Sequence, residues 1–403
     1  MKYLAEIIKE MGGKISPISS PITRDSVFFS TNASVTTLND SIVLNTRLSN
    51  YLWTPWIDDD IPIQRIFNTG DPNKIVYSYN EMGIWKYGFE GGHFIEPPLG
   101  QYKLWGTYAG LEDMRIVTWN NMVYGIGARP DLIGNKVVQQ LIEFTDDFQI
   151  NRSWILETNS NIEKGWLPVE GKPFTFMYDI AEGIIITLNP DDLDTENPNH
   201  IDLPVWSGKY AGSTPLIRYK DGYVCLGHIR IDYKEAGYRK VRYNHYFVKF
   251  NNDLKPVSVG QLFNFLTDGI EFACGLCNYD NDVLLTFSVG DSNCHMITMS
   301  KDIFERVVEM TMSNDEVESP EKPTNYFRDY FNYFNPCDAL AVAMGYLDKD
   351  NTEMMYGAIL DAADHYDLLE TDKETLKPIL MRMILRANDP HNGLRVVLDK
   401  LCK

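Results

Sequence analysis

A hairpin pattern that recurs five times within the first 300 residues constrains the fold of this chain more than any other feature. Each copy has an apolar strand, a tight polar turn and a second apolar strand, and successive turns are 50 to 81 residues apart. Asn, Asp and Gly occupy the turns, and these residues tolerate the positive φ angles that two-residue hairpin turns need. The five turns lie near Asp40, Asn121, Gly171, Gly222 and Asn281. A hairpin repeated at this interval is typical of β-propeller blades, so we expect a mainly β fold with a five-bladed β-propeller over residues 1–312.

The interval between the first two copies is the widest and leaves room for an insertion around residues 53–92. A strand-like stretch at 75–80 lies in this interval. If that stretch belonged to a blade of its own, the propeller would have six blades, which is the alternative.

The two ends of the chain differ from the hairpin repeat in residue composition and in the spacing of apolar positions. Charged Glu6, Lys9 and Glu10 interrupt the first apolar stretch, which favours a short helix over residues 1–12 rather than a signal peptide. Residues 313–324 are polar and contain two prolines, as linkers do, and residues 325–403 carry apolar positions at three- and four-residue spacing. We expect an α-helical C-terminal domain after the linker, acting as a cap or an oligomerisation module, or alternatively closing the mouth of the propeller.

Charge and cysteine content limit the partners. With 37 Lys and Arg against 56 Asp and Glu, the formal net charge is −19, which disfavours nucleic acid and anionic membranes as partners. No apolar run reaches the ~20 residues of a membrane span. The six cysteines include one CxxC pair, Cys274 and Cys277, without a second pair or paired histidines, so buried thiols are favoured over a zinc or redox site, and no metal is expected. This cysteine content favours the cytoplasm, or the cytoplasm of an infected host cell.

Polar and ionisable residues occupy the same end of every predicted hairpin, opposite its turn. If the hairpins are the inner strands of the blades, these residues meet at one mouth of the central channel. They are Asn32, Arg47, Glu112, Asp113, Arg115, Arg129, Lys164, Asp179, Thr214, His228, Glu271 and Asp291, with His245 in a neighbouring alternating strand. Such a mixture can hold an anion and protonate a leaving group, but it can also be a set of ion pairs lining a water-filled channel.

For three of these residues a purely structural role is a specific alternative to a role in the site. Asp113 is either a general acid or a carboxylate held in place by Arg115. His228 ends an apolar strand, where histidines are often part of the core. Glu271 fits a structural carboxylate that accepts backbone N–H groups.

Residues 111–116 (LEDMRI) resemble the Glu-Asp-Pro-Arg motif of the family 130 glycoside hydrolases and phosphorylases, which are five-bladed propellers. Met114 stands where that motif has proline, so we expect the backbone around Asp113 to be less fixed. Other stretches, in the same order, resemble that family or a glycosyltransferase-like branch of its superfamily. These stretches are 31–34, 45–47, 163–168, 211–215, 227–228, 242–245, 270–276 and 287–291.

The resemblance implies roles for individual residues. Asp113 matches the general acid, which acts through a sugar hydroxyl while inorganic phosphate attacks the anomeric carbon with inversion. Arg47, Arg115, Lys164 and His228 match positions that hold the anion. No cofactor is implied beyond phosphate or a sugar nucleotide as co-substrate.

The leading hypothesis is therefore an enzyme of carbohydrate metabolism, an inverting glycoside phosphorylase or a glycosyltransferase with an anion pocket at the propeller mouth. Its partners would be a carbohydrate and a sugar phosphate or sugar nucleotide, with a homo-oligomer formed through the helical domain. One alternative is a non-catalytic propeller that binds carbohydrate or protein, which the change at Met114 and the extra helical domain motivate. A further alternative is a five-bladed glycoside hydrolase, which relies on separated carboxylates.

Overall fold

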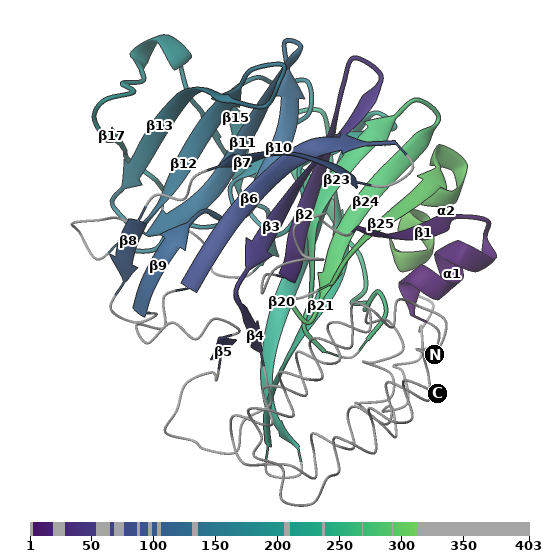
Figure 1. Ribbon diagram of the computed structural model, residues 1–403. Coiled ribbons are helices and arrows are strands. Elements are labelled where there is room, and N and C mark those ends of the chain that lie inside the picture. The colour runs from purple at the N-terminus through teal and green to yellow at the C-terminus, as the bar shows by residue number, and fades with distance from the viewer. Residues whose placement is uncertain are drawn as a thin grey trace, which may run out of the picture.

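Five β-sheets follow one another along the chain and surround a common axis, so the protein is a five-bladed β-propeller (Figure 1). The computed structural model describes residues 3–18, 29–53, 65–67, 76–86, 89–95, 99–102, 106–130, 136–204, 210–235, 238–267, 269–291 and 293–312. The linker and the helical domain expected at 313–324 and 325–403 lie outside the described residues and stay predictions.

Blade 1 is the largest sheet, with six strands, and blade 2 has five. Blade 1 contains β2 (Phe29–Leu38), β3 (Ser41–Ser49) and β6 (Val76–Trp85), with β7 (Phe89–Ile95), β8 (Leu99–Tyr102) and β9 (Gly106–Gly110) on its outer side. Blade 2 contains β10 (Glu112–Trp119), β11 (Met122–Pro130), β12 (Val137–Phe144), β13 (Ile150–Thr158) and the parallel strand β17 (Asn199–Ile201). A small separate sheet pairs β4 (Tyr51–Trp53) with β5 (Arg65–Phe67).

Blades 3 and 4 have short inner strands, and blade 5 combines strands from the start and the end of the propeller. Blade 3 contains β14 (Leu167–Pro168), β15 (Thr175–Asp179) and β16 (Ile184–Thr187), followed by a 3-10 turn at Pro190–Asp192. In blade 4, β18 (Ala211–Gly212) and β19 (Ile217–Tyr219) both pair with β20 (Gly222–Glu235), and β21 (Tyr238–Phe250) and β22 (Pro256–Val259) follow. Blade 5 contains β23 (Glu271–Tyr279), β24 (Asp282–Val289), β25 (Asn293–Ser300) and β1 (Lys14–Ile18).

Strand β1 closes the ring. It pairs antiparallel with β25 from Lys14 opposite Thr298 to Ile18 opposite Cys294. The fifth blade therefore joins the first and last described strands of the propeller, which leaves no open gap between the first and last blades. Helix α1 (Leu4–Glu10) precedes β1, within the range expected for the N-terminal helix.

The five predicted hairpins are the two innermost strand layers of the five blades, as the sequence pattern indicated. Two of the turns show the expected left-handed pairs, with φ of 47° and 61° at Asn39 and Asp40 and of 50° and 61° at Asn120 and Asn121. The expected stretch at 75–80 enters β6, the third strand of blade 1, so the six-bladed alternative is wrong.

The blade 4 turn lies slightly earlier than predicted. Its residues are Lys220, with φ of 50°, and Asp221, while Gly222 begins β20. A Cβ at Gly222 would collide with the carbonyl oxygen of Phe250 on the next strand, so glycine is required there by close packing of the strands rather than by the turn.

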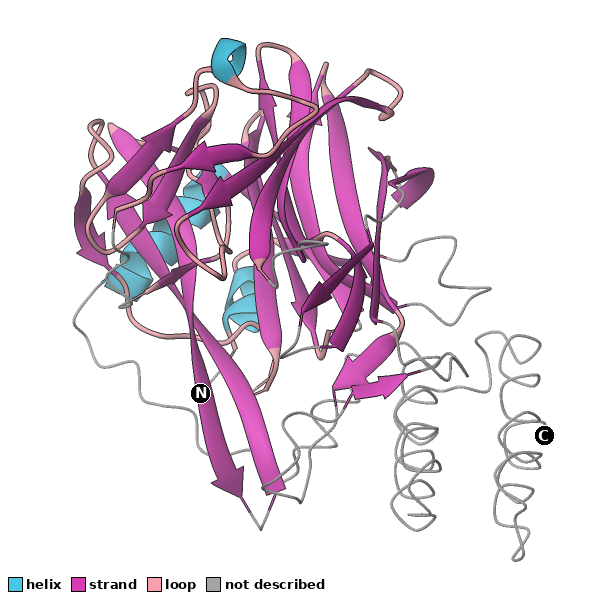
Figure 2. Cartoon of the chain, turned by 90° about the vertical axis from the view of Figure 1, so that its left-hand side faces the viewer, coloured by secondary structure: helices cyan, strands magenta, loops and turns pink. Residues whose placement is uncertain are grey.

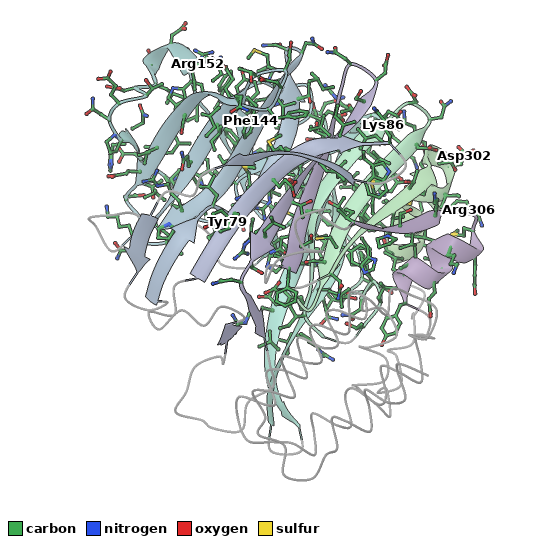
Figure 3. All side chains as sticks on the ribbon, viewed as in Figure 1. Tyr79, Lys86, Phe144, Arg152, Asp302 and Arg306 are labelled. Carbon is green, nitrogen blue, oxygen red and sulfur yellow. The ribbon has the colours of Figure 1, made fainter. Side chains whose placement is uncertain are left out.

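Large apolar side chains fill the spaces between neighbouring blades. Between blades 2 and 3, Trp119, Trp154, Trp166 and Phe176 form one buried cluster, with the Trp119 and Phe176 rings 5.5 Å apart edge to face. Phe144, labelled in Figure 3, belongs to the cluster between blades 1 and 2. Full burial of one such side chain contributes about 1.5–3 kcal/mol to stability, so the packing of these clusters holds the blades around the axis.

Strands, magenta in Figure 2, make up most of the described chain, and the helices are few. The second α-helix, α2 (Lys301–Met312), packs on blade 4 through Phe304, whose ring contacts those of Tyr219 and Phe247. Neither α-helix in the described ranges is long and apolar enough to cross a membrane. The prediction of buried thiols is confirmed for four cysteines, and burial raises the pKa of at least Cys225, Cys274 and Cys277. These four are Cys225, Cys274, Cys277 and Cys294, whereas Cys337 and Cys402 lie outside the described residues.

Candidate functional site

The inner strands of blades 1 and 2 carry the same irregularity at the same end of the ring of blades. The β2–β3 pairing shifts between Thr31 and Ser34, and the β10–β11 pairing shifts between Glu112 and Arg115. Inside these bulges Asn32 and Asp113 have φ of 44° and 51°, in the left-handed region that non-glycine residues rarely adopt. Such a conformation costs about 1–3 kcal/mol per residue and persists only where the surroundings hold it in place.

The carbonyl oxygens that flank the second bulge are held by side chains of blade 1. The Met114 oxygen accepts hydrogen bonds from Ser34 Oγ at 2.7 Å and Asn45 Nδ2 at 3.4 Å. The Leu111 oxygen accepts one from Asn80 Nδ2 at 3.0 Å, and the Asn45 amide also donates to Asn80 Oδ1 at 3.1 Å. The backbone here is therefore fixed by polar side chains, although methionine stands where the related motif has proline.

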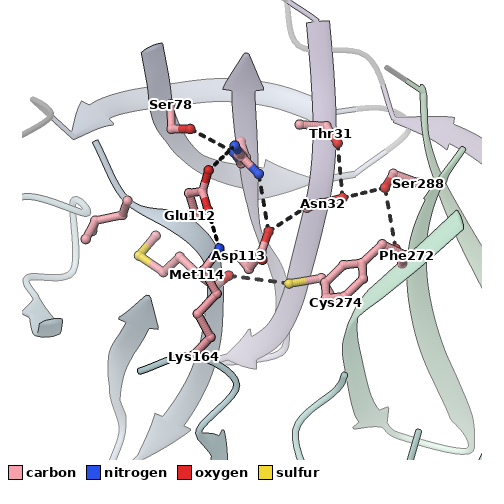
Figure 4. Close-up of polar contacts among 12 residues, drawn as sticks. Thr31, Asn32, Ser78, Glu112, Asp113, Met114, Lys164, Phe272, Cys274 and Ser288 are labelled. Carbon is pink, nitrogen blue, oxygen red and sulfur yellow. Dashed lines mark hydrogen bonds and ion pairs between the residues drawn. The ribbon is translucent and has the colours of Figure 1, made fainter. Parts of the chain in front are cut away.

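Asp113 lies between an amide and a guanidinium (Figure 4). Its Oδ1 accepts hydrogen bonds from Asn32 Nδ2 at 2.7 Å and from Arg47 Nη1 at 3.3 Å. No described residue donates to Oδ2. The Asp113 side chain is 21% exposed, so one carboxylate oxygen is anchored while the other is open to a ligand.

Glu112 points to two cations on either side. Its Oε1 accepts from Arg47 Nη2 at 3.0 Å and its Oε2 accepts from Lys164 Nζ at 2.6 Å. Arg47 also donates from Nε to Ser78 Oγ at 2.9 Å. The Arg47 side chain is 4% exposed and that of Lys164 is 33% exposed, so Lys164 is the cation of this group that reaches solvent.

Arg115 is a buried cation with unusual partners. Its guanidinium donates to the backbone oxygens of Ser213 at 2.5 Å, Gly212 at 3.4 Å and Asp113 at 3.0 Å, and it lies 5.9 Å from the centre of the Phe272 ring. Within the described residues it makes no ion pair with a carboxylate. The five charged side chains of this cluster sum to +1, from Arg47, Arg115 and Lys164 against Glu112 and Asp113, in a protein of net charge −19.

His228, on β20, lies beside this cluster. Its Nδ1 is 2.8 Å from Ser213 Oγ, and its ring lies 5.1 Å from that of Phe272. Burial, and next the charge of Arg115, lower the pKa of His228 to about 4, so the ring is neutral at neutral pH. In the tautomer in which Nδ1 accepts from Ser213, the Nε2–H is a donor for a ligand.

His245 lies behind His228, with the two ring centres 6.4 Å apart. Its Nε2 accepts the backbone N–H of Ala273 at 3.2 Å, which places the proton of the neutral ring on Nδ1. Burial holds the pKa of His245 well below its usual value. His245 is fully buried, so its ring packs behind His228 and has no exposure to solvent.

Glu271 and Thr214 make structural contacts. Glu271 is fully buried and accepts backbone N–H groups at 2.6 to 2.7 Å from Phe265, Leu266 and Thr267, which ties down that loop. Thr214 Oγ1 accepts the N–H of Leu226, at the gap between β18 and β19.

For two further predicted residues the described contacts lie outside the Asp113 cluster, and for a third only the backbone is described. Arg129 donates to Gln140 on the next strand, and Asp179 accepts the N–H groups of two residues in the turn after β15. Asp291 has a left-handed φ of 52° just after β24. A role of these three in binding stays a prediction.

The sequence reasoning did not identify the side chains that organise the cluster. Ser288 Oγ and Thr31 Oγ1 donate to Asn32 Oδ1, at 2.5 and 3.0 Å, and so orient its amide. Ser78 and Asn80 come from β6, and their stretch had no assigned blade in the sequence pattern. Only a correct assignment of β6 to blade 1 would have revealed them.

No protein-family model and no curated protein matches this chain. Solved structures of similar fold include a β-1,2-mannobiose phosphorylase from Listeria innocua, with 14% identity, a TM-score of 0.44, and coverage of 73% of this chain and 93% of that one. A mannose phosphorylase from Leishmania mexicana in complex with phosphate has 15% identity, a TM-score of 0.42, and coverage of 75% and 93%. A putative glycoside hydrolase from Parabacteroides distasonis has 14% identity, a TM-score of 0.45, and coverage of 70% and 91%.

Proposed function

We propose that this propeller is a carbohydrate-active enzyme that cleaves or forms a glycosidic bond with inversion, as a glycoside phosphorylase or a glycosyltransferase. The observation that carries the proposal is the placement of Asp113, with one anchored and one open carboxylate oxygen beside the Arg115 guanidinium, which no described carboxylate neutralises. An inverting displacement by phosphate requires an acid for the leaving group and a separate site for the attacking anion.

Asp113 acts as the general acid in this proposal. Its Oδ1 accepts two N–H groups, from Asn32 and Arg47, so a proton on the carboxyl group belongs on Oδ2. From Oδ2 the proton passes to a sugar hydroxyl, which in turn protonates the glycosidic oxygen, as the motif resemblance implies. The left-handed bulge fixes the direction of Oδ2 before the substrate binds, which lowers the reorganisation needed in the transition state.

The anion is a phosphate, or the diphosphate of a sugar nucleotide, as co-substrate. Arg115 and Lys164 supply charge, and neutral His228 supplies a hydrogen-bond donor that does not depend on protonation near neutral pH. A cluster charge of +1 favours binding of an anion to a site whose surroundings are otherwise acidic.

A direct test measures phosphate-dependent cleavage of a panel of β-linked disaccharides, mannobioses first because mannoside phosphorylases are among the similar folds. The expected product is a sugar 1-phosphate of inverted anomeric configuration, detected by NMR, and the reverse reaction is tested with sugar 1-phosphates and sugar nucleotides as donors. Asp113→Asn should lower turnover at least 1,000-fold without changing the melting temperature by more than a few degrees. Asp146→Asn, in an exposed turn of blade 2, is the matched control and should remain active.

A non-catalytic carbohydrate-binding propeller is a second candidate, and one observation favours it. Glu112 already pairs with both Arg47 and Lys164, as in a channel lined by ion pairs. In that case sugars would bind, and Arg47→Ala would abolish the binding, but no donor in the panel would be turned over with or without phosphate.

A further inference from the structure

Ser213 is a buried residue that contacts two of the residues proposed to hold the anion. It directly follows β18 in blade 4 and is fully buried. Its hydroxyl oxygen lies 2.8 Å from Nδ1 of His228, and its backbone oxygen accepts the Nε–H of Arg115 at 2.5 Å. One residue therefore links the histidine of β20 to the arginine of β10.

The backbone of Ser213 is held by the strand that carries His228. The N–H of Ser213 donates to the Leu226 oxygen at 2.9 Å, and Oγ1 of Thr214 accepts the Leu226 N–H at 3.0 Å. β18 pairs with β20 so that Ala211 lies opposite His228. The position of Ser213 is thus fixed by strand pairing, as is required of a residue that orients the ligand-binding groups of a site.

The hydrogen bond between Ser213 and His228 determines which ring nitrogen carries the proton. Among the described residues, His228 is the only partner of the Ser213 hydroxyl. If Nδ1–H donated to Oγ, the hydroxyl proton would be buried without an acceptor, which is unfavourable. The hydroxyl therefore donates to Nδ1, and the proton of the neutral ring lies on Nε2. His228 is partly exposed and Nε2 bonds no residue in the described part of the chain, so this N–H is available to a ligand.

The tautomer decides whether His228 attracts or repels an anion. With the proton on Nε2 the ring offers a hydrogen-bond donor, whereas the other tautomer would turn a lone pair toward the same ligand. Protonation of the ring does not supply the donor near neutral pH, because burial lowers the pKa of His228 to about 4. The donor therefore depends on the hydroxyl of Ser213.

The backbone oxygen of Ser213 has a corresponding effect on Arg115. The Arg115 guanidinium donates to the backbone oxygens of Ser213, Gly212 and Asp113. Neutral acceptors of this kind orient a guanidinium without cancelling its charge. We propose that Ser213 is a positioning residue of the anion site, which fixes the Nε2–H tautomer of His228 and the direction of the Arg115 guanidinium. This inference rests on the proposed function, because it assigns both groups to a phosphate or diphosphate ligand.

The first test reads the tautomer in the full-length protein without any ligand. In protein labelled with ¹⁵N at histidine, nitrogen chemical shifts distinguish a ring nitrogen that carries a proton from one that carries a lone pair, and His228→Phe identifies the signals of His228. At neutral pH we expect the proton on Nε2 alone in the unmodified protein. Ser213→Ala removes the donor to Nδ1, so both tautomers should be populated. A proton on Nδ1 in the unmodified protein, or no change in Ser213→Ala, would overturn the proposal.

The second test measures whether the Ser213 hydroxyl acts on the anion through His228. Ser213→Ala keeps the backbone oxygen that bonds Arg115, so the dissociation constant for inorganic phosphate in isothermal titration calorimetry should rise about fivefold, as for the loss of one hydrogen bond. In a His228→Phe background, which keeps a ring but no ring nitrogen, Ser213→Ala should have no further effect. Equal losses in both backgrounds would show a general structural effect and contradict the proposal.

Ser258→Ala is the matched control, because Ser258 lies on β22 of the same blade and its buried hydroxyl has no partner in the described ranges. It should change neither the tautomer nor the phosphate affinity. Failure of the proposed function gives a different result from failure of this proposal. In the first case the unmodified protein binds neither phosphate nor a sugar nucleotide, whereas in the second case it binds phosphate as tightly as Ser213→Ala does.

Discussion

The side-chain amide of Asn32 donates a 2.7 Å hydrogen bond to the carboxylate of Asp113, and both residues have left-handed backbones in equivalent bulges of neighbouring blades. Ser288, from blade 5, in turn donates to the oxygen of the same amide. Three blades thus fix one carboxylate, and the orientation of that carboxylate depends on how the inner strands of the ring meet rather than on one loop.

Replacing Asn32 with aspartate should weaken phosphate binding. A second carboxylate beside Asp113 lowers the cluster charge from +1 to 0, so we expect the dissociation constant for inorganic phosphate to rise about five- to tenfold, as for ~1 kcal/mol of charge repulsion in a partly screened site. Isothermal titration calorimetry measures this constant. Asn32→Ala, which removes the amide without adding charge, should have the smaller effect, and an equal effect of both variants would contradict the electrostatic explanation.

Replacing Glu112 with glutamine should have the opposite effect on the same measurement. The change releases Arg47 and Lys164 from their shared carboxylate and raises the cluster charge to +2, so phosphate should bind more tightly. Stability should fall, because the buried Arg47 guanidinium loses an ionic partner, and breaking a buried pair costs about 3–5 kcal/mol. Urea denaturation measures the loss. Unchanged or weaker phosphate binding in this variant would place the anion elsewhere.

The sequence was sufficient to predict the blades but not the contacts inside the mouth. The hairpins at Asp40 and Asn121 have local turn chemistry that fixes their register, so the inner strand pairs could be predicted from composition and spacing. The side chains that hold the Leu111 carbonyl and orient the Asn32 amide could not, because Asn80 is 31 residues from Leu111 and Ser288 is 256 residues from Asn32 along the chain. Glu271 and Thr214 show the opposite case. Their position at strand ends predicted side chains at the mouth of the propeller, but both accept hydrogen bonds from backbone N–H groups.

Stability should fall as the pH falls from about 6.5 to about 4. Burial lowers the pKa of His228 and that of His295 to about 4, whereas an unfolded histidine has a pKa near 6.5. Between these values the unfolded chain binds more protons than the folded one, so protons favour unfolding, and below pH 4 the effect no longer grows.

Histidine variants separate the contribution of His228 and His295 to the pH dependence of stability from that of the carboxylates. His228→Gln and His295→Gln should each reduce the pH slope of the free energy of unfolding by about one proton within that window. His200→Gln, whose side chain is 62% exposed in the native protein, should leave the slope unchanged. The measurement is urea denaturation at half-unit pH steps, and identical slopes in all three variants would contradict the assignment.

Glu271→Gln should destabilise the protein without changing ligand binding. The ionised carboxylate accepts three backbone N–H groups of the loop at 265–267, and hydrogen bonds to a charged group contribute about 1.5–3 kcal/mol each. An amide keeps one acceptor oxygen but turns an NH₂ group toward the other N–H donors, so we expect a loss of at least that amount in urea denaturation. Phosphate affinity should stay within twofold of the unmodified protein, because Glu271 is fully buried and bonds this loop rather than the Asp113 cluster. A large loss of phosphate affinity at unchanged stability would instead place Glu271 in the binding site, as its position at a strand end first indicated.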